Sequence, residues 1–412
     1  MDFLMLEANK CFKCKNARCS ASCPINTPIP EVIALFEQGE KEKAAKMLFE
    51  NNPLSAICAY ICPHERQCSG NCVRSRKGDP VLFQKIEAKL SSGYLHSLKL
   101  EKPAPNGKKI AIVGSGPAGI TGALLLASKG YYVTLYEIRT RIGGALRYAI
   151  PEFRLEPRLI DKLEEMLVSL GVHIKTNTMV GPVITIDKLL DDGYDAVYIA
   201  TGVWNPRTLN IKGETLGHVT YAINYLKAPK TFDIRGKVCV IGAGDVAMDA
   251  ARCAKRYGAS DVSVLYRGNE YQMSATKHEI EGAKDDGIEF IFNKVPTEIT
   301  PEGMYVESTE QEVLEDGSAK LIPIPNSKEF LEFDNILVAV SQTAANNIVS
   351  NTAGLETKYG LLVTDQFAST TKKGVFATGD VVSGAKTVVL AVANAKVAVE
   401  GIKRYCFPED AE

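Results

Sequence analysis

The chain has 412 residues, of which 45% are hydrophobic and 24% are charged, and its formal net charge is −1. This composition excludes a disordered or fibrous chain, and the length allows two or three domains. A nucleic-acid binder normally carries an excess of basic residues, so no nucleic-acid partner is expected.

Cysteines are concentrated at the start of the chain, which has no apolar run typical of a secretory signal. We therefore expect a cytoplasmic protein whose clustered thiolates bind metal rather than form disulfides. Eight of the eleven cysteines follow the patterns C-x2-C-x4-C-x3-C-P and C-x3-C-P-x4-C-x3-C, and they are Cys11, Cys14, Cys19, Cys23, Cys58, Cys62, Cys68 and Cys72. Of the other three, Cys239 and Cys253 lie in apolar surroundings and are expected to be buried, whereas Cys406 is uninformative.

Two kinds of metal site fit this pattern. Four thiolates within 13 residues could close one tetrahedral zinc site. The dipeptides Cys23-Pro24 and Cys62-Pro63 instead favour iron–sulfur clusters, because a Cys-Pro ends the bacterial ferredoxin motif, whose fourth cysteine binds the other cluster. We therefore expect two [4Fe–4S] clusters with interleaved ligands. The first three cysteines take a ligand from the second group, and the fourth joins the second cluster.

The segment between the two cysteine groups has apolar residues at helical spacing over residues 30–51, and Asn52-Pro53 ends this pattern. This predicts a helix with one face in the core. Residues 99–107 contain two prolines and a glycine and are typical of a linker. Residues 1–105 are thus expected to form a small helical domain that depends on its metal for stability.

A dinucleotide-binding pattern follows the linker. The segment 110–128 has no charged residue over 19 positions, but its glycines and proline favour a strand, a turn and a helix over a membrane span. Strand 110–113, the turn Gly114-Ser-Gly-Pro-Ala-Gly119, a helix over 120–128 and strand 132–136 are expected, with Glu137 placed to accept from a ribose hydroxyl. The helix N-terminus attracts phosphate, and the glycines allow its close approach.

The same pattern occurs a second time. Strand 237–241 leads into Gly242-Ala-Gly-Asp-Val-Ala247, and a helix is expected through Arg256. The next strand, 262–266, ends in Arg267 rather than in an acid. A guanidinium suits a 2′-phosphate, so this site favours NADP, although an exposed arginine is often only solvated.

Two Ala-Thr-Gly turns complete the pattern. One follows the strand 195–199 and contains Thr201 and Gly202, and the other ends in Gly379-Asp380 and leads into a buried helix that starts near Thr387. We expect this late turn to contact the first dinucleotide; the alternative is that Asp380 is an ordinary helix cap.

These ordered motifs, together with Gly143-Gly144 and the segment 150–155, resemble the iron–sulfur branch of the two-dinucleotide-binding flavoproteins. That branch includes the small subunit of bacterial glutamate synthase and the N-terminal half, or NAD-linked subunit, of dihydropyrimidine dehydrogenase. The resemblance covers nearly the whole chain. It implies an α/β fold with two Rossmann-like domains, preceded by an α-helical domain with two [4Fe–4S] clusters. The implied domains are 1–105 for the clusters, 106–205 with 341–412 for FAD, and 206–340 for NAD(P).

The resemblance also implies cofactor-binding residues. For FAD they are Gly114, Ser115, Gly116, Pro117, Ala118, Gly119, Glu137, Gly143, Gly144, Arg154, Thr201, Gly202, Gly379, Asp380, Thr387 and Val388. For NAD(P) they are Gly242, Ala243, Gly244, Asp245, Val246, Ala247 and Arg267. The ligands of one cluster are Cys11, Cys14, Cys19 and Cys72, and those of the other are Cys23, Cys62, Cys68 and Glu87. Counting thiols alone selects Cys58 in place of Glu87.

The sequence departs from the family pattern in four places. Relatives that use NADPH commonly have two arginines where Arg267 is followed by Gly268, so the choice of cofactor is open. Ser341 replaces a glycine in a turn on the nucleotide side, and residues 391–395 lack a pair of glycines. No redox-active cysteine pair follows Gly143-Gly144, which excludes a disulfide-reducing enzyme of the thioredoxin-reductase type.

The resemblance implies an oxidoreductase that serves as an electron-input subunit. NAD(P)H would reduce FAD, and the clusters would pass single electrons to a partner catalytic subunit of the dihydropyrimidine dehydrogenase or glutamate synthase kind. No catalytic acid or base is predicted, and the five histidines form no convincing pair. The alternatives are a stand-alone NAD(P)H:acceptor reductase, using for example ferredoxin or polysulfide, and a zinc-bearing interaction protein on a degenerate flavoprotein scaffold.

Overall fold

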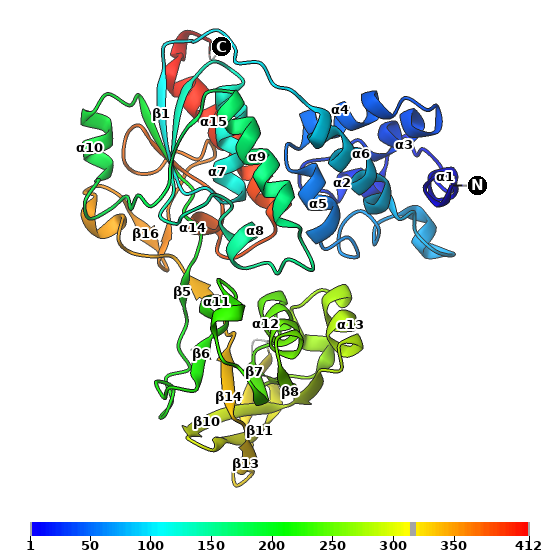
Figure 1. The fold of residues 1–412 in the computed structure, drawn as a ribbon, viewed down its shortest axis with the longest axis vertical. Helices are drawn as coiled ribbons and strands as arrows, with labels where there is room; N and C mark the ends of the chain where they lie inside the picture. The colour runs from blue at the N-terminus through cyan, green and yellow to red at the C-terminus, as the bar shows by residue number, and fades with distance from the viewer. Residues whose placement is uncertain (1, 314–318, 411–412) are drawn as a thin grey trace. The chain divides into compact units, whose positions relative to one another are not determined.

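The computed structural model describes residues 2–313 and 319–410, which divide into two compact units. The first unit contains residues 1–147, 152–203 and 343–412, and the second contains residues 148–151 and 204–342. Figure 1 shows the chain running through the first unit, into the second and back. Among the described residues, no helix combines the length and the apolar character needed to cross a membrane.

The first unit begins with a helical module (Figure 1). Its helices are α1 (Phe3–Asn9), α2 (Arg18–Ala21), α3 (Ile29–Glu37), α4 (Lys41–Asn51), α5 (Ser55–Ile61) and α6 (Phe83–Ser97), with a 3-10 turn at Val73–Arg76. Ile33, Phe36, Leu48 and Ile86 are buried in its core. The single helix predicted over residues 30–51 is wrong, because Gly39 has a φ of +80° and separates α3 from α4. No helix or strand lies between Ser97 and Lys109.

A parallel five-stranded sheet forms the rest of the first unit, in the order β18-β4-β1-β2-β3. Its strands are β1 (Lys109–Val113), β2 (Tyr132–Tyr136), β3 (His173–Lys175), β4 (Ala196–Ile199) and β18 (Val375–Ala377). Figure 1 shows α7 (Pro117–Ala127), α9 (Pro157–Ser169) and α15 (Val388–Cys406) on one side of the sheet and α10 (Ile186–Asp191) on the other. The segment 110–128 is therefore a strand, a turn and a helix.

The second unit contains another parallel sheet, in the order β6-β14-β7-β8-β9. Its strands are β6 (Val219–Tyr221), β7 (Gly236–Ile241), β8 (Ala259–Tyr266), β9 (Glu289–Phe292) and β14 (Asn335–Val338), and its main helices are α12 (Asp245–Arg256) and α13 (Lys277–Asp285). An antiparallel sheet that the sequence analysis did not predict lies between β9 and β14 in the chain. It consists of β10 (Lys294–Thr300), β11 (Gly303–Val313), β12 (Ala319–Pro323) and β13 (Glu329–Glu332).

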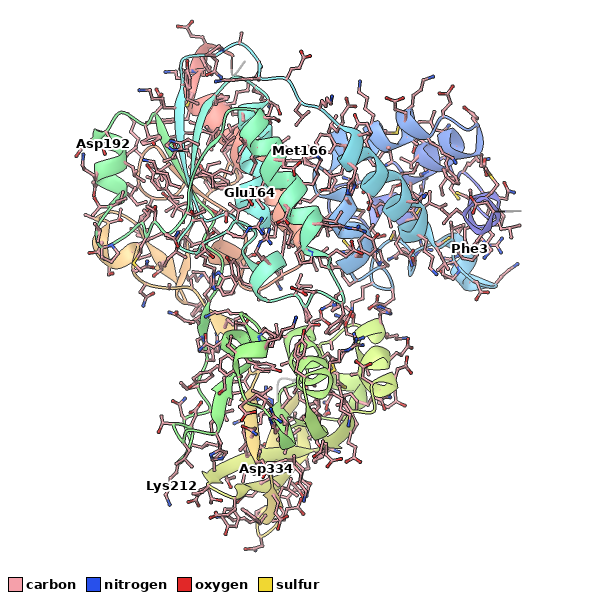
Figure 2. The ribbon with its side chains drawn as sticks, in the orientation of Figure 1. Phe3, Glu164, Met166, Asp192, Lys212 and Asp334 are labelled. Atoms are coloured by element: carbon pink, nitrogen blue, oxygen red, sulfur yellow. The ribbon has the colours of Figure 1, made fainter. Side chains whose placement is uncertain are left out.

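The two parallel sheets begin in the same way. Asp195 precedes β4 and accepts a hydrogen bond from Lys109 N, at 2.8 Å, where β1 begins. Asp334, labelled in Figure 2, precedes β14 and accepts from Lys237 N, at 2.7 Å, near the start of β7. In each sheet an aspartate therefore fixes the register between the strand that leads into the glycine turn and its neighbour.

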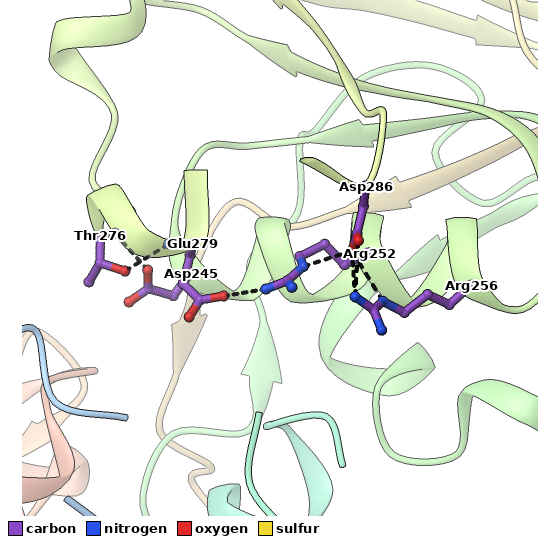
Figure 3. A network of polar contacts seen from close by, with 6 residues as sticks. All are labelled: Asp245, Arg252, Arg256, Thr276, Glu279 and Asp286. Carbon is purple, nitrogen blue, oxygen red and sulfur yellow. Dashed lines mark hydrogen bonds and ion pairs between the residues drawn. The ribbon is translucent and has the colours of Figure 1, made fainter. Parts of the chain in front are cut away.

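Ion pairs hold α12 against α13 in the second unit (Figure 3). Arg252 lies 2.9 Å from both Glu279 and Asp286, and Arg256 lies 3.0 Å from Asp286. Burial alone would raise the pKa of Asp286, but the two guanidinium groups lower it below its usual value. Glu279 is only 2% exposed, so its ion pair with Arg252 stabilises a buried charge.

Replacing Arg252 with Met should lower the free energy of unfolding of the second unit by about 3–5 kcal/mol, because it removes the guanidinium that pairs with the buried Glu279 carboxylate. Urea denaturation of the whole protein, followed by the nucleotide-binding signal of this unit, measures the change. The matched variant Arg235→Met removes a pair in which both side chains are 80% exposed, and its unfolding midpoint should equal that of the wild type. Equal midpoints for both variants would contradict the role assigned to Arg252.

Candidate functional site

The turn between β1 and α7 is held by close backbone contacts. Gly114 has a φ of +101°, and a Cβ on it would lie 2.5 Å from the carbonyl oxygen of Ala200 and 3.0 Å from the Cα of Thr201. A Cβ on Gly119 would lie 1.9 Å from the carbonyl oxygen of Gly114. Only glycine fits either position, so these residues shape the turn that the sequence predicts.

Gly116, the middle glycine, is different. Its φ of −74° suits any residue, and a Cβ there would meet only the Cα of Gly144, at 3.9 Å. The fold itself therefore does not require glycine at this position. The space above Gly116 is instead left open at the N-terminus of α7, where unpaired backbone N–H groups favour the binding of an anion. This open cradle fits a dinucleotide pyrophosphate.

The Gly143-Gly144 loop lies beside this turn. Gly143 N donates to the carbonyl oxygen of Ser115 at 3.0 Å, and Gly144 has a φ of +51°. Glu137, at the end of β2, is buried and accepts from Ser115 N at 3.2 Å, from the Ser115 hydroxyl and from Arg139 N at 2.8 Å. Glu137 is thus at the place predicted for a ribose acceptor, and it also holds the turn.

The late turn lies against the start of α7. A Cβ on Gly379 would lie 3.2 Å from the Cβ of Ala118, and Asp380 accepts from Lys386 N at 3.2 Å. Burial raises the pKa of Asp380 to about 6. Asp380 is the first residue of α14 (Asp380–Ser383), whose N-cap is Gly379, so it is not an ordinary helix cap.

A buried tyrosine connects these segments, and the sequence analysis missed it. Tyr198 on β4 is fully buried, and its hydroxyl bonds to that of Thr378 and donates to the carbonyl oxygen of Ala118 at 3.4 Å. A Cβ on Gly122 would lie 2.6 Å from the Tyr198 ring, so α7 needs glycine where it crosses this side chain. No motif marks a tyrosine in the middle of a strand.

The other predicted flavin residues lie in the same unit. Thr201 and Gly202 follow β4, and Arg154 is half-buried in the turn before α9. Thr387 is the N-cap of α15 and accepts from Leu390 N at 3.4 Å, which places Val388 in the first turn of this helix. The helix α15 packs along α7, so its N-terminus belongs to the same layer as the glycine turn.

The turn after β7 has the same design. Gly242 has a φ of +132°, and a Cβ on it would lie 2.4 Å from the carbonyl oxygen of Ala339, which follows β14 as Ala200 follows β4. Gly244 is the N-cap of α12, and Ala247 is fully buried. The Asp245 carboxylate accepts a hydrogen bond from Thr276 N at 2.8 Å. It is therefore bound to the segment before α13 and does not occupy the phosphate position at the N-terminus of α12.

Three further residues of this site are placed by the structure. The Ala243 carbonyl accepts from Ala275 N at 3.0 Å, and Val246 is half-buried in the first turn of α12. Arg267 follows β8 with its side chain exposed and with no ion pair to any described residue. Ser341 has a φ of +97°, the conformation that favours the glycine expected there.

The cysteines form two groups in the helical module. Cys11, Cys14, Cys19 and Cys72 line one cavity, together with Phe12, Pro30 and Val81. Cys23 is not among the lining residues, although it belongs to the first sequence group. Cys72 of the second sequence group therefore lies with Cys11, Cys14 and Cys19, whereas the single zinc site considered above needed the four consecutive cysteines.

The second group consists of Cys23, Cys62 and Cys68 with Cys58 and Glu87. Each of these side chains lies within electrostatic range of another member, and burial raises the pKa of Cys68 to about 12. Burial also raises the pKa of Glu87 well above its usual value. The described residues give the Glu87 side chain no hydrogen bond or ion pair. A buried, ionised carboxylate beside three thiols is unfavourable, so Glu87 is either protonated or bound by a positive centre.

In the described part of the chain, no three potential ligands converge closely enough to hold a single metal ion. The donor set, seven or eight thiols and a carboxylate, fits iron–sulfur clusters. Cys239 and Cys253, in the second unit, are buried as predicted.

Comparison with known proteins agrees with this combination of two nucleotide-binding turns and two cysteine groups. A family model described as pyridine nucleotide-disulphide oxidoreductase matches residues 108–395, and one described as domain II of dihydropyrimidine dehydrogenase, with a 4Fe-4S cluster, matches residues 2–95. The chain belongs to the pyridine nucleotide-disulphide oxidoreductase family, in the branch that carries an N-terminal iron–sulfur domain.

Three relatives illustrate this branch. The NAD-dependent dihydropyrimidine dehydrogenase subunit PreT homolog of Salmonella typhi is 31% identical, and the alignment covers 97% of this chain and 93% of that protein. The glutamate synthase [NADPH] small chain of Azospirillum brasilense is 30% identical, with 97% and 88% covered. The putative oxidoreductase AegA of Escherichia coli is also 30% identical, but this chain spans only 64% of its length.

Solved structures show the same fold at lower identity. FprA of Mycobacterium tuberculosis in complex with NADPH is 18% identical, with a TM-score of 0.63 over 74% of this chain and 86% of that one. The thioredoxin reductase of Lactococcus lactis is 24% identical, with a TM-score of 0.56 over 73% and 99%. The predicted fold class is confirmed. The chain is an oxidoreductase whose cofactors are FAD, NAD(P) and [4Fe–4S] clusters.

Proposed function

We propose that the chain is the electron-input subunit of a larger enzyme and passes electrons from NAD(P)H to a partner catalytic subunit. One observation carries this proposal: the first unit contains both the open glycine cradle and the two groups of cluster ligands. Bound together, FAD and the clusters supply the chemistry that converts hydride into single electrons. Several relatives, including glutamate synthase small chains and the beta subunit of a formate dehydrogenase from Moorella thermoacetica, are named as parts of multi-subunit enzymes.

The residues of this chain bind, orient and shield the cofactors. We assign FAD to the β1–α7 turn, with Glu137, the Gly143-Gly144 loop and the turn at Gly379-Asp380 around it, and we assign NAD(P) to the β7–α12 turn. The helix N-termini orient the phosphates, and the buried walls exclude water. We assign one cluster to Cys11, Cys14, Cys19 and Cys72, and the other to Cys23, Cys62, Cys68 and Glu87. The close contact of Cys58 with Cys62 keeps Cys58 as the alternative eighth ligand.

These assignments define the domains. The cluster domain comprises residues 1–105, the FAD domain residues 106–205 and 341–412, and the NAD(P) domain residues 206–340. The division of the structure near residues 203 and 343 supports the limits of the inserted domain.

Affinity capture of the tagged protein from anaerobic native extract tests the partner. The proposal predicts a second subunit, captured in equal amount, whose substrate is reduced with NAD(P)H only when both subunits are present. A protein that is recovered alone and reduces ferredoxin or polysulfide at the full rate would contradict the proposal and favour a stand-alone reductase.

Arg267 should determine the choice of nicotinamide cofactor, since its guanidinium is free to bind a 2′-phosphate. Replacing Arg267 with Ala should lower kcat/KM for NADPH by about 10- to 100-fold, because a hydrogen bond to a charged group contributes about 1.5–3 kcal/mol. The value for NADH should not change. Diaphorase assays with both cofactors measure this, and an equal loss with NADH would contradict the assignment.

A further inference from the structure

Lys396 connects the flavin domain to the cluster domain within the first unit. It lies on α15, whose N-cap Thr387 is one of the residues assigned to FAD. The Lys396 ammonium donates to the carbonyl oxygen of Asn51, the last residue of α4. The carbonyl groups at a helix C-terminus lack partners within the helix and carry partial negative charge, so a cation is favourable there.

The same contact leads to the second group of cluster ligands. The Asn51 side chain donates to the carbonyl oxygen of Ile25 at 3.1 Å, two residues after Cys23. Cys23 itself lies within electrostatic range of Lys396. Burial lowers the pKa of the Lys396 ammonium, and the neighbouring Cys23 acts against this decrease. Lys396 is thus a half-buried cation between α4 and the segment that contains Cys23.

We infer that Lys396 is a positioning residue whose positive charge raises the reduction potential of the cluster bound by Cys23. This inference rests on the proposed function. A [4Fe–4S] cluster becomes more negative when it accepts an electron, and a fixed cation nearby stabilises that reduced form. Because Lys396 is half-buried, its charge is screened by solvent less than that of an exposed lysine. The cation belongs to the flavin domain, so this domain supplies a charge near the cluster that contains Cys23.

The test is an EPR-monitored redox titration of the whole protein with its clusters assembled anaerobically. Lys396→Gln keeps a hydrogen-bond donor for the Asn51 carbonyl but removes the charge. This substitution should favour the oxidised form of one cluster about tenfold. Its midpoint potential should therefore fall by about 59 mV. Lys396→Arg should keep the wild-type value. The control Lys43→Gln removes a 68% exposed charge from α4 and should change nothing.

The outcomes separate this inference from the proposed function. Protein without clusters would refute the proposed function. Intact clusters whose midpoint potentials are the same in wild type and Lys396→Gln would overturn the inference alone. If the Lys396→Gln protein lacks one cluster and the Lys396→Arg protein contains both, the cluster content supports the requirement for a positive charge at this position. Loss of the cluster in both variants would show that the site needs the shape of lysine and would overturn the role of its charge.

Discussion

Replacing Cys72 with Ser is expected to halve the iron content of anaerobically prepared protein, from about eight atoms per chain to about four. The reason is that Cys72, although it ends the second sequence group, shares a cavity with Cys11, Cys14 and Cys19. One cluster should therefore be lost while the flavin and the other cluster are retained. Iron analysis and EPR of the dithionite-reduced protein measure the result.

The control for this experiment is Cys239→Ser, a buried cysteine of the second unit, which should keep all of its iron. An iron content in Cys72→Ser equal to that of the wild type would contradict the interleaved assignment.

The same assay decides between Glu87 and Cys58. Glu87→Ala should change the EPR signal of the second cluster, and Cys58→Ser should leave it unchanged if Glu87 is the ligand.

Replacing Gly116 with Ala should weaken FAD binding by about 10- to 100-fold, because one extra methyl group in a filled cradle costs about 1–3 kcal/mol. The flavin-free protein should fold as the wild type does, since a Cβ at Gly116 meets no protein atom closer than 3.9 Å. Flavin fluorescence gives the affinity, and thermal unfolding of the flavin-free protein gives the stability.

Gly244→Ala is the matched variant in the second turn, where a Cβ would meet only the Ser274 hydroxyl at 3.4 Å. It should retain FAD and lose affinity for NAD(P)H. If Gly116→Ala bound FAD with wild-type affinity, or if Gly244→Ala lost FAD instead, the assignment of the two turns would be wrong.

The sequence was most informative where backbone geometry permits few residue types. The strands around Gly114 and Gly242 were predicted within a few residues, because only glycine tolerates the carbonyl contacts found there. The helix α12 ends at Arg256, as predicted. The ferredoxin spacing predicted that the first three cysteines take a ligand from the second group. The family resemblance implied that this ligand is Cys72, which lines the same cavity as those three cysteines.

Features that depend on contacts distant in the sequence could not be predicted. The hydroxyl of Tyr198 meets groups of Ala118 and Thr378, and nothing in the local sequence distinguishes this tyrosine from a core residue. The strands of the antiparallel sheet β10–β13 have mixed burial, so their hydrophobic periodicity in the sequence is weak. Gly39 was an available signal, because a glycine after a helical pattern commonly ends the helix.

The central claim is that this chain passes electrons from NAD(P)H through its flavin to its own clusters. Anaerobic mixing with excess NAD(P)H, followed by flavin absorbance and by EPR of rapidly frozen samples, tests it most directly. The account predicts that the flavin band bleaches first and that signals of reduced [4Fe–4S] clusters then appear. A flavin that bleaches fully while every cluster stays oxidised under continued NAD(P)H regeneration would contradict it.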